Sequence, residues 1–65
     1  MTYFAAFYID DKDRKFYYLK LNRWRCICFD TNTVKLWKSV GAVERYFKLR
    51  GRAIDEKLQI EAVYL

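Results

Sequence analysis

The chain has 65 residues and a net charge of +5, with 54% hydrophobic and 20% aromatic residues and no histidine or proline. This length predicts one domain, residues 1–65, and an apolar content this high excludes a disordered chain. Without histidine the chain lacks the commonest general base and metal ligand, and two isolated glycines form no phosphate-binding loop. We therefore expect that the protein is not an enzyme and that it binds no cofactor, metal ion or small-molecule substrate.

The first predicted element is a strand over residues 2–10, TYFAAFYID, which is apolar on both alternating faces. The acidic residues 10–13 that follow predict a solvated turn, since they lack the glycine and the later glutamate of a calcium loop. No basic region precedes the strand, and no run approaches the roughly 20 apolar residues of a membrane span. We expect a cytoplasmic protein without membrane contact.

Residues 16–29, FYYLKLNRWRCICF, predict a hairpin with a two-residue turn at Asn22-Arg23. In that register one face is wholly apolar and is the expected core; it carries Tyr17, Leu19, Leu21, Trp24, Cys26 and Cys28. The other face mixes aromatic and basic side chains; it carries Phe16, Tyr18, Lys20, Arg25, Ile27 and Phe29. One helix can cover only one face, so we expect the second face to meet a partner. The two cysteines are expected to be buried and reduced.

The remaining elements predict a short strand over residues 34–37, a helix over 40–50 and a last strand over 57–65. Ser39 is the expected N-cap, and Gly51 is placed to end the helix. The helix face that should meet the hairpin core holds Val40, Val43, Tyr46 and Phe47. The last strand is expected to be one-sided, with Leu58, Ile60, Ala62 and Tyr64 inward. The fold class is α+β, in the order β-β-β-β-α-β: a mostly antiparallel sheet of four to five strands with one helix packed on one face.

The middle of the chain is strongly basic. Residues 14–52 hold eleven lysines and arginines against Asp30 and Glu44, so their net charge is 11 − 2 = +9. Cations neutralise phosphates, and aromatic rings on a sheet can stack with unpaired bases. We therefore expect a non-catalytic module that binds nucleic acid through a basic, aromatic sheet face. The candidate residues are Arg14, Lys15, Phe16, Tyr18, Lys20, Arg23, Arg25, Phe29, Lys35, Trp37 and Lys38.

Three strands followed by a helix, ending in FDTNTVKLWKSVGAVERYF, resemble the small three-stranded DNA-binding domains of phage integrases in topology and helix start. A second hypothesis is a phage- or mobile-element-type inhibitor or adaptor that binds an acidic or nucleic-acid-binding host protein. The surplus of tyrosine, tryptophan and arginine, which are enriched at interface hot spots, favours it. A third alternative is that the aromatic residues fill a small core and the open sheet pairs with a second copy to form a homodimer.

Overall fold

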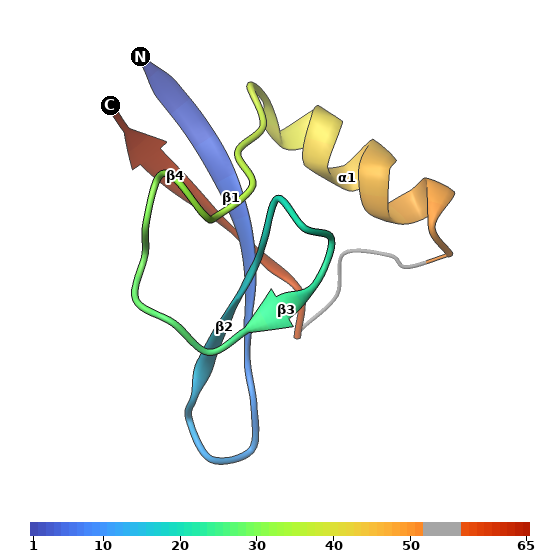
Figure 1. The fold of residues 1–65 in the computed structure, drawn as a ribbon. Helices are drawn as coiled ribbons and strands as arrows, with labels where there is room; N and C mark the ends of the chain where they lie inside the picture. Colours follow the sequence, from blue (N-terminus) through green and yellow to red (C-terminus); the bar gives the residue numbers. More distant parts are fainter. Residues whose placement is uncertain (52–56) are drawn as a thin grey trace.

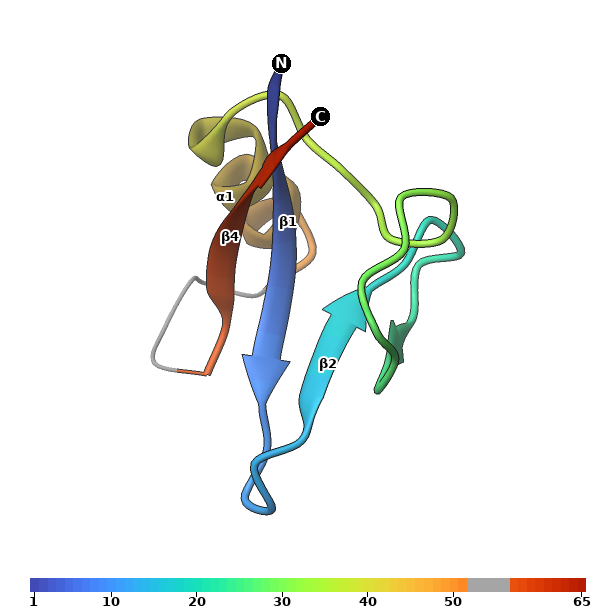
Figure 2. The ribbon, with the colours of Figure 1, turned by 90° about the vertical axis from the view of Figure 1, so that its left-hand side faces the viewer.

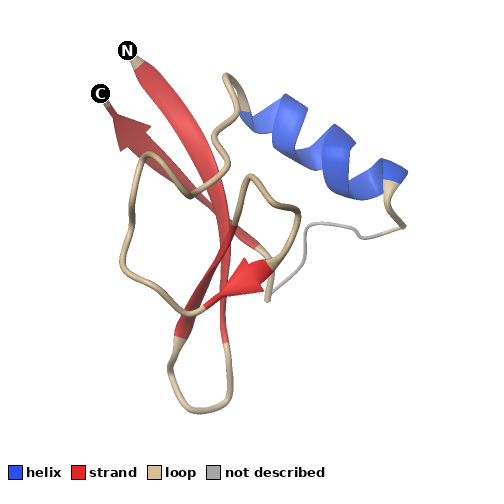
Figure 3. Ribbon diagram, in the orientation of Figure 1, coloured by secondary structure: helices blue, strands red, loops and turns tan. Residues whose placement is uncertain are grey.

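The computed structural model describes residues 1–51 and 57–65, and its elements follow the order β-β-β-α-β. They are β1 (Thr2–Ile9), β2 (Lys15–Tyr18), β3 (Trp24–Arg25), α1 (Val40–Leu49) and β4 (Gln59–Tyr64) (Figure 1). The strands form one antiparallel sheet in the order β3-β2-β1-β4, with the helix on one side (Figure 3). The predicted α+β fold is confirmed. The predicted connector, residues 52–56, lies outside the described residues.

The prediction of a strand over residues 34–37 is wrong. Val34 bridges to Leu19 and Trp37 bridges to Phe4, and these are isolated pairings. The second bridge is closed by two hydrogen bonds of 2.8 Å between the backbone groups of Phe4 and Trp37. The segment therefore pairs at one point with Leu19, just after β2, and at another with Phe4 of β1, without forming a continuous ladder.

The predicted hairpin register is also wrong. Tyr18 pairs with Trp24, and the Leu19 N–H donates to the Arg23 carbonyl at 2.9 Å, so the loop holds three residues, 20–22. Asn22, the last of them, has a φ of 62°, the left-handed conformation that asparagine tolerates and that closes three-residue hairpin loops. Asn22 was correctly predicted to lie in the turn, but it is the last of three loop residues and not the first of two.

This shift changes which residues of the two strands share a face, because successive side chains of a strand point to opposite sides. Tyr18 and Trp24 now lie beneath the helix, whereas Leu19 packs on the opposite side. Leu21, predicted to be in the core, is 73% exposed in the loop. The expected contact between the helix and a face of Leu19, Leu21, Trp24 and Cys26 is thus correct only for Trp24.

The core on the helix side is mainly aromatic. Val43 and Phe47 of α1 pack against the sheet and against Trp37, which bridges to β1. The buried cluster is Ala6, Tyr18, Trp37, Val43, Phe47 and Leu58. The helix begins as predicted, since the Ser39 hydroxyl accepts a hydrogen bond from the Ala42 N–H at 3.1 Å. Gly51, with a φ of 76°, follows its C-terminus. The described residues form no helix with the length and apolar character needed to cross a membrane.

The opposite face of the sheet has a core of its own, which the sequence did not predict. The chain between β3 and the helix covers it with Ile27, Phe29, Val34 and Leu36, of which Val34 is fully buried. The buried residues beneath this segment are Ala5, Tyr17, Leu19 and Val63. The prediction of a one-sided β4 is wrong, because Val63 is buried on the face away from the helix, whereas Ala62 and Tyr64, expected inward, are exposed. Cys26 and Cys28, expected inside, are exposed because this covering segment turns them outward.

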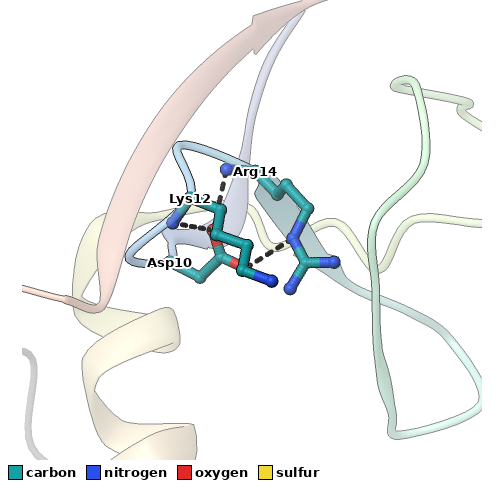
Figure 4. Close-up of polar contacts among 3 residues, drawn as sticks. All are labelled: Asp10, Lys12 and Arg14. Atoms are coloured by element: carbon teal, nitrogen blue, oxygen red, sulfur yellow. Dashed lines mark hydrogen bonds and ion pairs between the residues drawn. The ribbon is translucent and has the colours of Figure 1, made fainter.

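The turn between β1 and β2 is closed by a single carboxylate, as Figure 4 shows. Asp10 Oδ1 accepts from the N–H groups of Lys12 and Arg14, and its Oδ2 forms a 2.7 Å ion pair with Arg14 Nε. Hydrogen bonds from the Arg14 and Lys12 N–H groups, together with the guanidinium, lower the pKa of Asp10 although desolvation opposes them. This acidic segment is therefore a structural turn built around Asp10.

Candidate functional site

The described surface has a hollow of about 420 Å³ between the β2–β3 hairpin and the loop after β3. It lies on the side of the sheet away from the helix, where Arg25 shares a face with Tyr17. Its lining combines an apolar wall with two arginines; the residues are Leu19, Leu21, Arg23, Arg25, Ile27, Cys28, Asp30 and Thr33. The hollow has the volume of a small ligand site.

The hollow has an excess of positive charge. Arg23 and Arg25 line it, and neither forms an ion pair with a carboxylate of residues 1–51 or 57–65. Asp30 is the lining carboxylate, and Lys20 lies close enough to help lower its pKa. Counting these four side chains, the local charge is 3 − 1 = +2.

The loop itself uses the hydrogen-bonding capacity of Asp30. Its Oδ1 accepts from the Asn32 N–H at 3.0 Å and its Oδ2 from the Thr33 hydroxyl at 2.8 Å. These two bonds are the main reason that the pKa of Asp30 is lowered. Because the carboxylate closes its own turn, both guanidinium groups keep their donors for a ligand.

The hairpin turn that carries this site is anchored to the helix. Asn22 Oδ1 accepts a hydrogen bond of 2.9 Å from the Tyr46 hydroxyl, which also lies 3.0 Å from the Tyr18 hydroxyl. Burial, and then the hydrogen bond with Tyr46, raise the pKa of Tyr18. The left-handed turn is thereby fixed from the opposite face of the sheet.

The structure divides the predicted binding residues between the two faces. Lys20, Arg23 and Arg25 gather at the hollow, whereas five others lie on the helix side: Arg14, Phe16, Tyr18, Lys35 and Trp37. Tyr18 and Trp37 are buried there, so neither can stack with a base. Phe16 stacks on Tyr8 at 4.9 Å and is covered in part by Arg14. Lys38 is exposed before the helix.

Lys15 and Phe29 belong to a third group, on the face away from the helix. The Lys15 ammonium forms a 2.5 Å ion pair with Glu61 and lies 4.3 Å from the ring centre of Phe7. Glu61 also accepts a 2.9 Å hydrogen bond from the Tyr17 hydroxyl, and Phe29 packs edge-on against the Tyr17 ring. Lys15 therefore links β2 to β4, and Phe29 holds the covering loop on the sheet.

The same network predicts a loss of stability at high pH. Burial, above all, raises the pKa of Tyr17, and hydrogen bonds to Glu61 and Tyr17 raise that of Lys15 despite desolvation. Both groups have higher pKa values folded than unfolded, so their stabilisation is complete below about pH 10 and is lost as the pH rises through the folded values. Urea midpoints measured from pH 8 to 11 should fall above pH 10.

Tyr17→Phe removes one of the titrating groups, so this fall should become shallower, although the variant is less stable at neutral pH. Tyr64→Phe is the control, because Tyr64 is 79% exposed. A pH profile that Tyr17→Phe leaves as steep as in the wild type would contradict the assignment.

Sequence reasoning missed most of the hollow, because only Arg23 and Arg25 of its eight lining residues were candidates. Leu19, Leu21, Ile27 and Cys28 were assigned to the hairpin strands, and Asp30 and Thr33 were not singled out. The acidic and hydroxyl side chains of residues 30–33 were the available signal, since they favour a closed local turn that brings the loop back over β3. No group of three or more potential metal ligands occurs among the described residues.

Comparisons with known proteins identified no relative of this chain. A scan against protein-family models found no match, and searches of curated proteins and of solved structures found none either.

Proposed function

We propose that this protein is a small, non-catalytic binding module that contacts nucleic acid through the hollow beside the β2–β3 hairpin. The observation that carries the proposal is the pair Arg23 and Arg25, which line the hollow while its carboxylate, Asp30, is held by its own loop. A guanidinium offers a planar set of donors that matches a phosphate group. Because neither arginine forms an ion pair within the described residues, the pair forms an anion site that stays net positive despite Asp30.

Nucleic acid fits this site better than an isolated small anion does. The apolar wall of Leu21 and Ile27 lies beside the two arginines, as a sugar or a base edge lies beside its phosphate. The net charge of +5 attracts a polyanion over a longer range and speeds its association. We place the module in the cytoplasm, since exposed free thiols such as Cys26 and Cys28 persist in a reducing compartment.

Fluorescence anisotropy with labelled single- and double-stranded DNA, measured from low to physiological salt, tests the proposal. We expect binding that persists at physiological salt and weakens linearly with the logarithm of salt concentration, with a slope of about two or three phosphate contacts. Absence of binding to either form at low salt would contradict it. Binding that is seen only at low salt would also contradict it, because any basic surface attracts DNA at low salt.

A second candidate function, a stoichiometric inhibitor of a host protein, is favoured by Leu21. This side chain is 73% exposed at the rim of the hollow, next to Arg23, a residue type common in interface hot spots. Leu21→Ser should abolish capture of such a partner with little dependence on salt, whereas it should weaken nucleic-acid binding only slightly.

A further inference from the structure

Strand β4 forms one edge of the sheet, on the side of β1 away from β2 (Figure 2). The Leu65 N–H donates to the Met1 carbonyl at 2.9 Å, so backbone groups of alternate residues from Leu65 backwards, Val63 and Glu61 among them, point toward β1. Phe4, opposite Ala62, turns both backbone groups to Trp37 instead, which confirms the alternation. Ile60, Ala62 and Tyr64 therefore direct their N–H and C=O groups outward.

Among the described residues, this outer edge has few of the features that usually protect a strand from pairing. The sequence QIEAVY contains no lysine, arginine or proline, its one charged residue, Glu61, is ion-paired with Lys15, and its pairing with β1 runs without a bulge. Ala62 and Tyr64 are exposed on the edge, and the second of them is a large side chain, 79% exposed. Beyond β4, no strand of the described residues pairs with it.

A second copy of the chain fits this edge in one antiparallel register. With Ala62 opposite Ala62 of the second copy, Ile60 faces Tyr64 twice, and all three outward residues exchange both backbone hydrogen bonds. With Glu61 opposite Glu61, two carboxylates lie directly opposite each other, which is destabilising. With Val63 opposite Val63, Ile60 has no residue opposite it in the second copy. The strand is therefore self-complementary about Ala62.

We propose that the protein forms a two-fold symmetric homodimer in which two β4 strands pair antiparallel about Ala62, joining two four-stranded sheets into one. The interface lies at the end of the sheet remote from β3, so it leaves the hollow of each copy open. It also adds burial to a chain whose small size limits its own core. The proposal stands independently of nucleic-acid binding.

Sedimentation over a dilution series from millimolar to micromolar should show a species of about 16 kDa, twice the 8.0 kDa chain, that dissociates on dilution. Ala62→Lys and Ala62→Glu place like charges opposite each other on the two-fold axis, so each variant should be monomeric. An equimolar mixture should recover the dimer, because the two charges then face each other. Ala62→Ser keeps the backbone and the neutral character, and serves as the matched control.

A wild-type chain that stays monomeric at millimolar concentration would overturn the proposal. Dimers that survive in both charged variants, or a mixture of the folded variants that stays monomeric, would overturn it as well. Hydrogen exchange of the wild type gives a readout that needs no variant. The amides of Ile60, Ala62 and Tyr64 should be protected at high concentration and lose that protection on dilution, while the Val63 amide, bonded within the chain, stays protected. Exchange at Ala62 that does not depend on concentration would contradict the dimer.

Discussion

Replacing Phe47 with alanine is expected to leave most of the protein unfolded at 25 °C. Phe47 is 1% exposed, and its ring lies between 5.1 and 5.8 Å from those of Tyr18, Trp24 and Trp37. Removing a buried phenylalanine side chain costs about 3–5 kcal/mol. A single core in a domain of this size rarely supplies more than about 3–5 kcal/mol in total, so the substitution removes most of the free energy of unfolding.

Circular dichroism in the aromatic region and urea unfolding measure this effect. Leu49→Ala is the matched control on the same helix, because Leu49 is 83% exposed and should keep a near-normal transition. Phe47→Leu should lose less stability than Phe47→Ala, since it retains part of the buried volume. A cooperative transition of Phe47→Ala within about 1 kcal/mol of the wild type would show that the helix is not the main cover of this face.

Neutralising Arg23 and Arg25 together is expected to weaken nucleic-acid binding by roughly 10- to 100-fold, taking about 1 kcal/mol or somewhat more for each exposed charge-assisted contact. The double variant Arg23→Gln/Arg25→Gln keeps polar side chains, so it removes charge with little change in packing. The salt slope should fall by about two, one for each phosphate contact that is lost.

Arg45→Gln/Lys48→Gln is the matched control for that measurement. Both residues are exposed on α1, on the helix side of the sheet, and their replacement lowers the net charge from +5 to +3, as the test variant does. Only generic attraction should be lost, so we expect a decrease of a few-fold at most. Equal losses in the two variants would show that net charge alone drives binding and that the hollow is not the site.

Local signals in the sequence predicted the parts of the fold that depend on local structure. The apolar strand of residues 2–10, the Ser39 cap and the helix over 40–50 follow from alternation, capping and helical period, and each lies within a residue of its observed bounds. The hairpin failed because its register depends on one backbone conformation, that of Asn22. A loop of three residues rather than two pairs Trp24 with Tyr18 instead of Leu21, so Trp24 shares a face with Tyr18 and no longer with Tyr17 and Leu19.

The candidate site was predicted in part for the same reason. Arg23, Arg25 and Lys20 were identified from charge, but the aromatic residues expected beside them lie in the two cores or on the helix face. That the loop of residues 26–36 would fold back over the sheet could not be inferred from alternation. Its apolar residues, such as Ile27 and Phe29, are as compatible with a strand as with a cover.

The most direct test of the proposed interface is an NMR titration of the ¹⁵N-labelled protein with a short single-stranded oligonucleotide at physiological salt. We expect the amide shifts to concentrate in residues 20–33, around the hollow, and the side-chain Nε–H signals of Arg23 and Arg25 to move with them. Residues 44–48, on the helix, should stay in place. Shifts centred on the helix, or spectra that the oligonucleotide leaves unchanged, would contradict the assignment of the hollow as a nucleic-acid site.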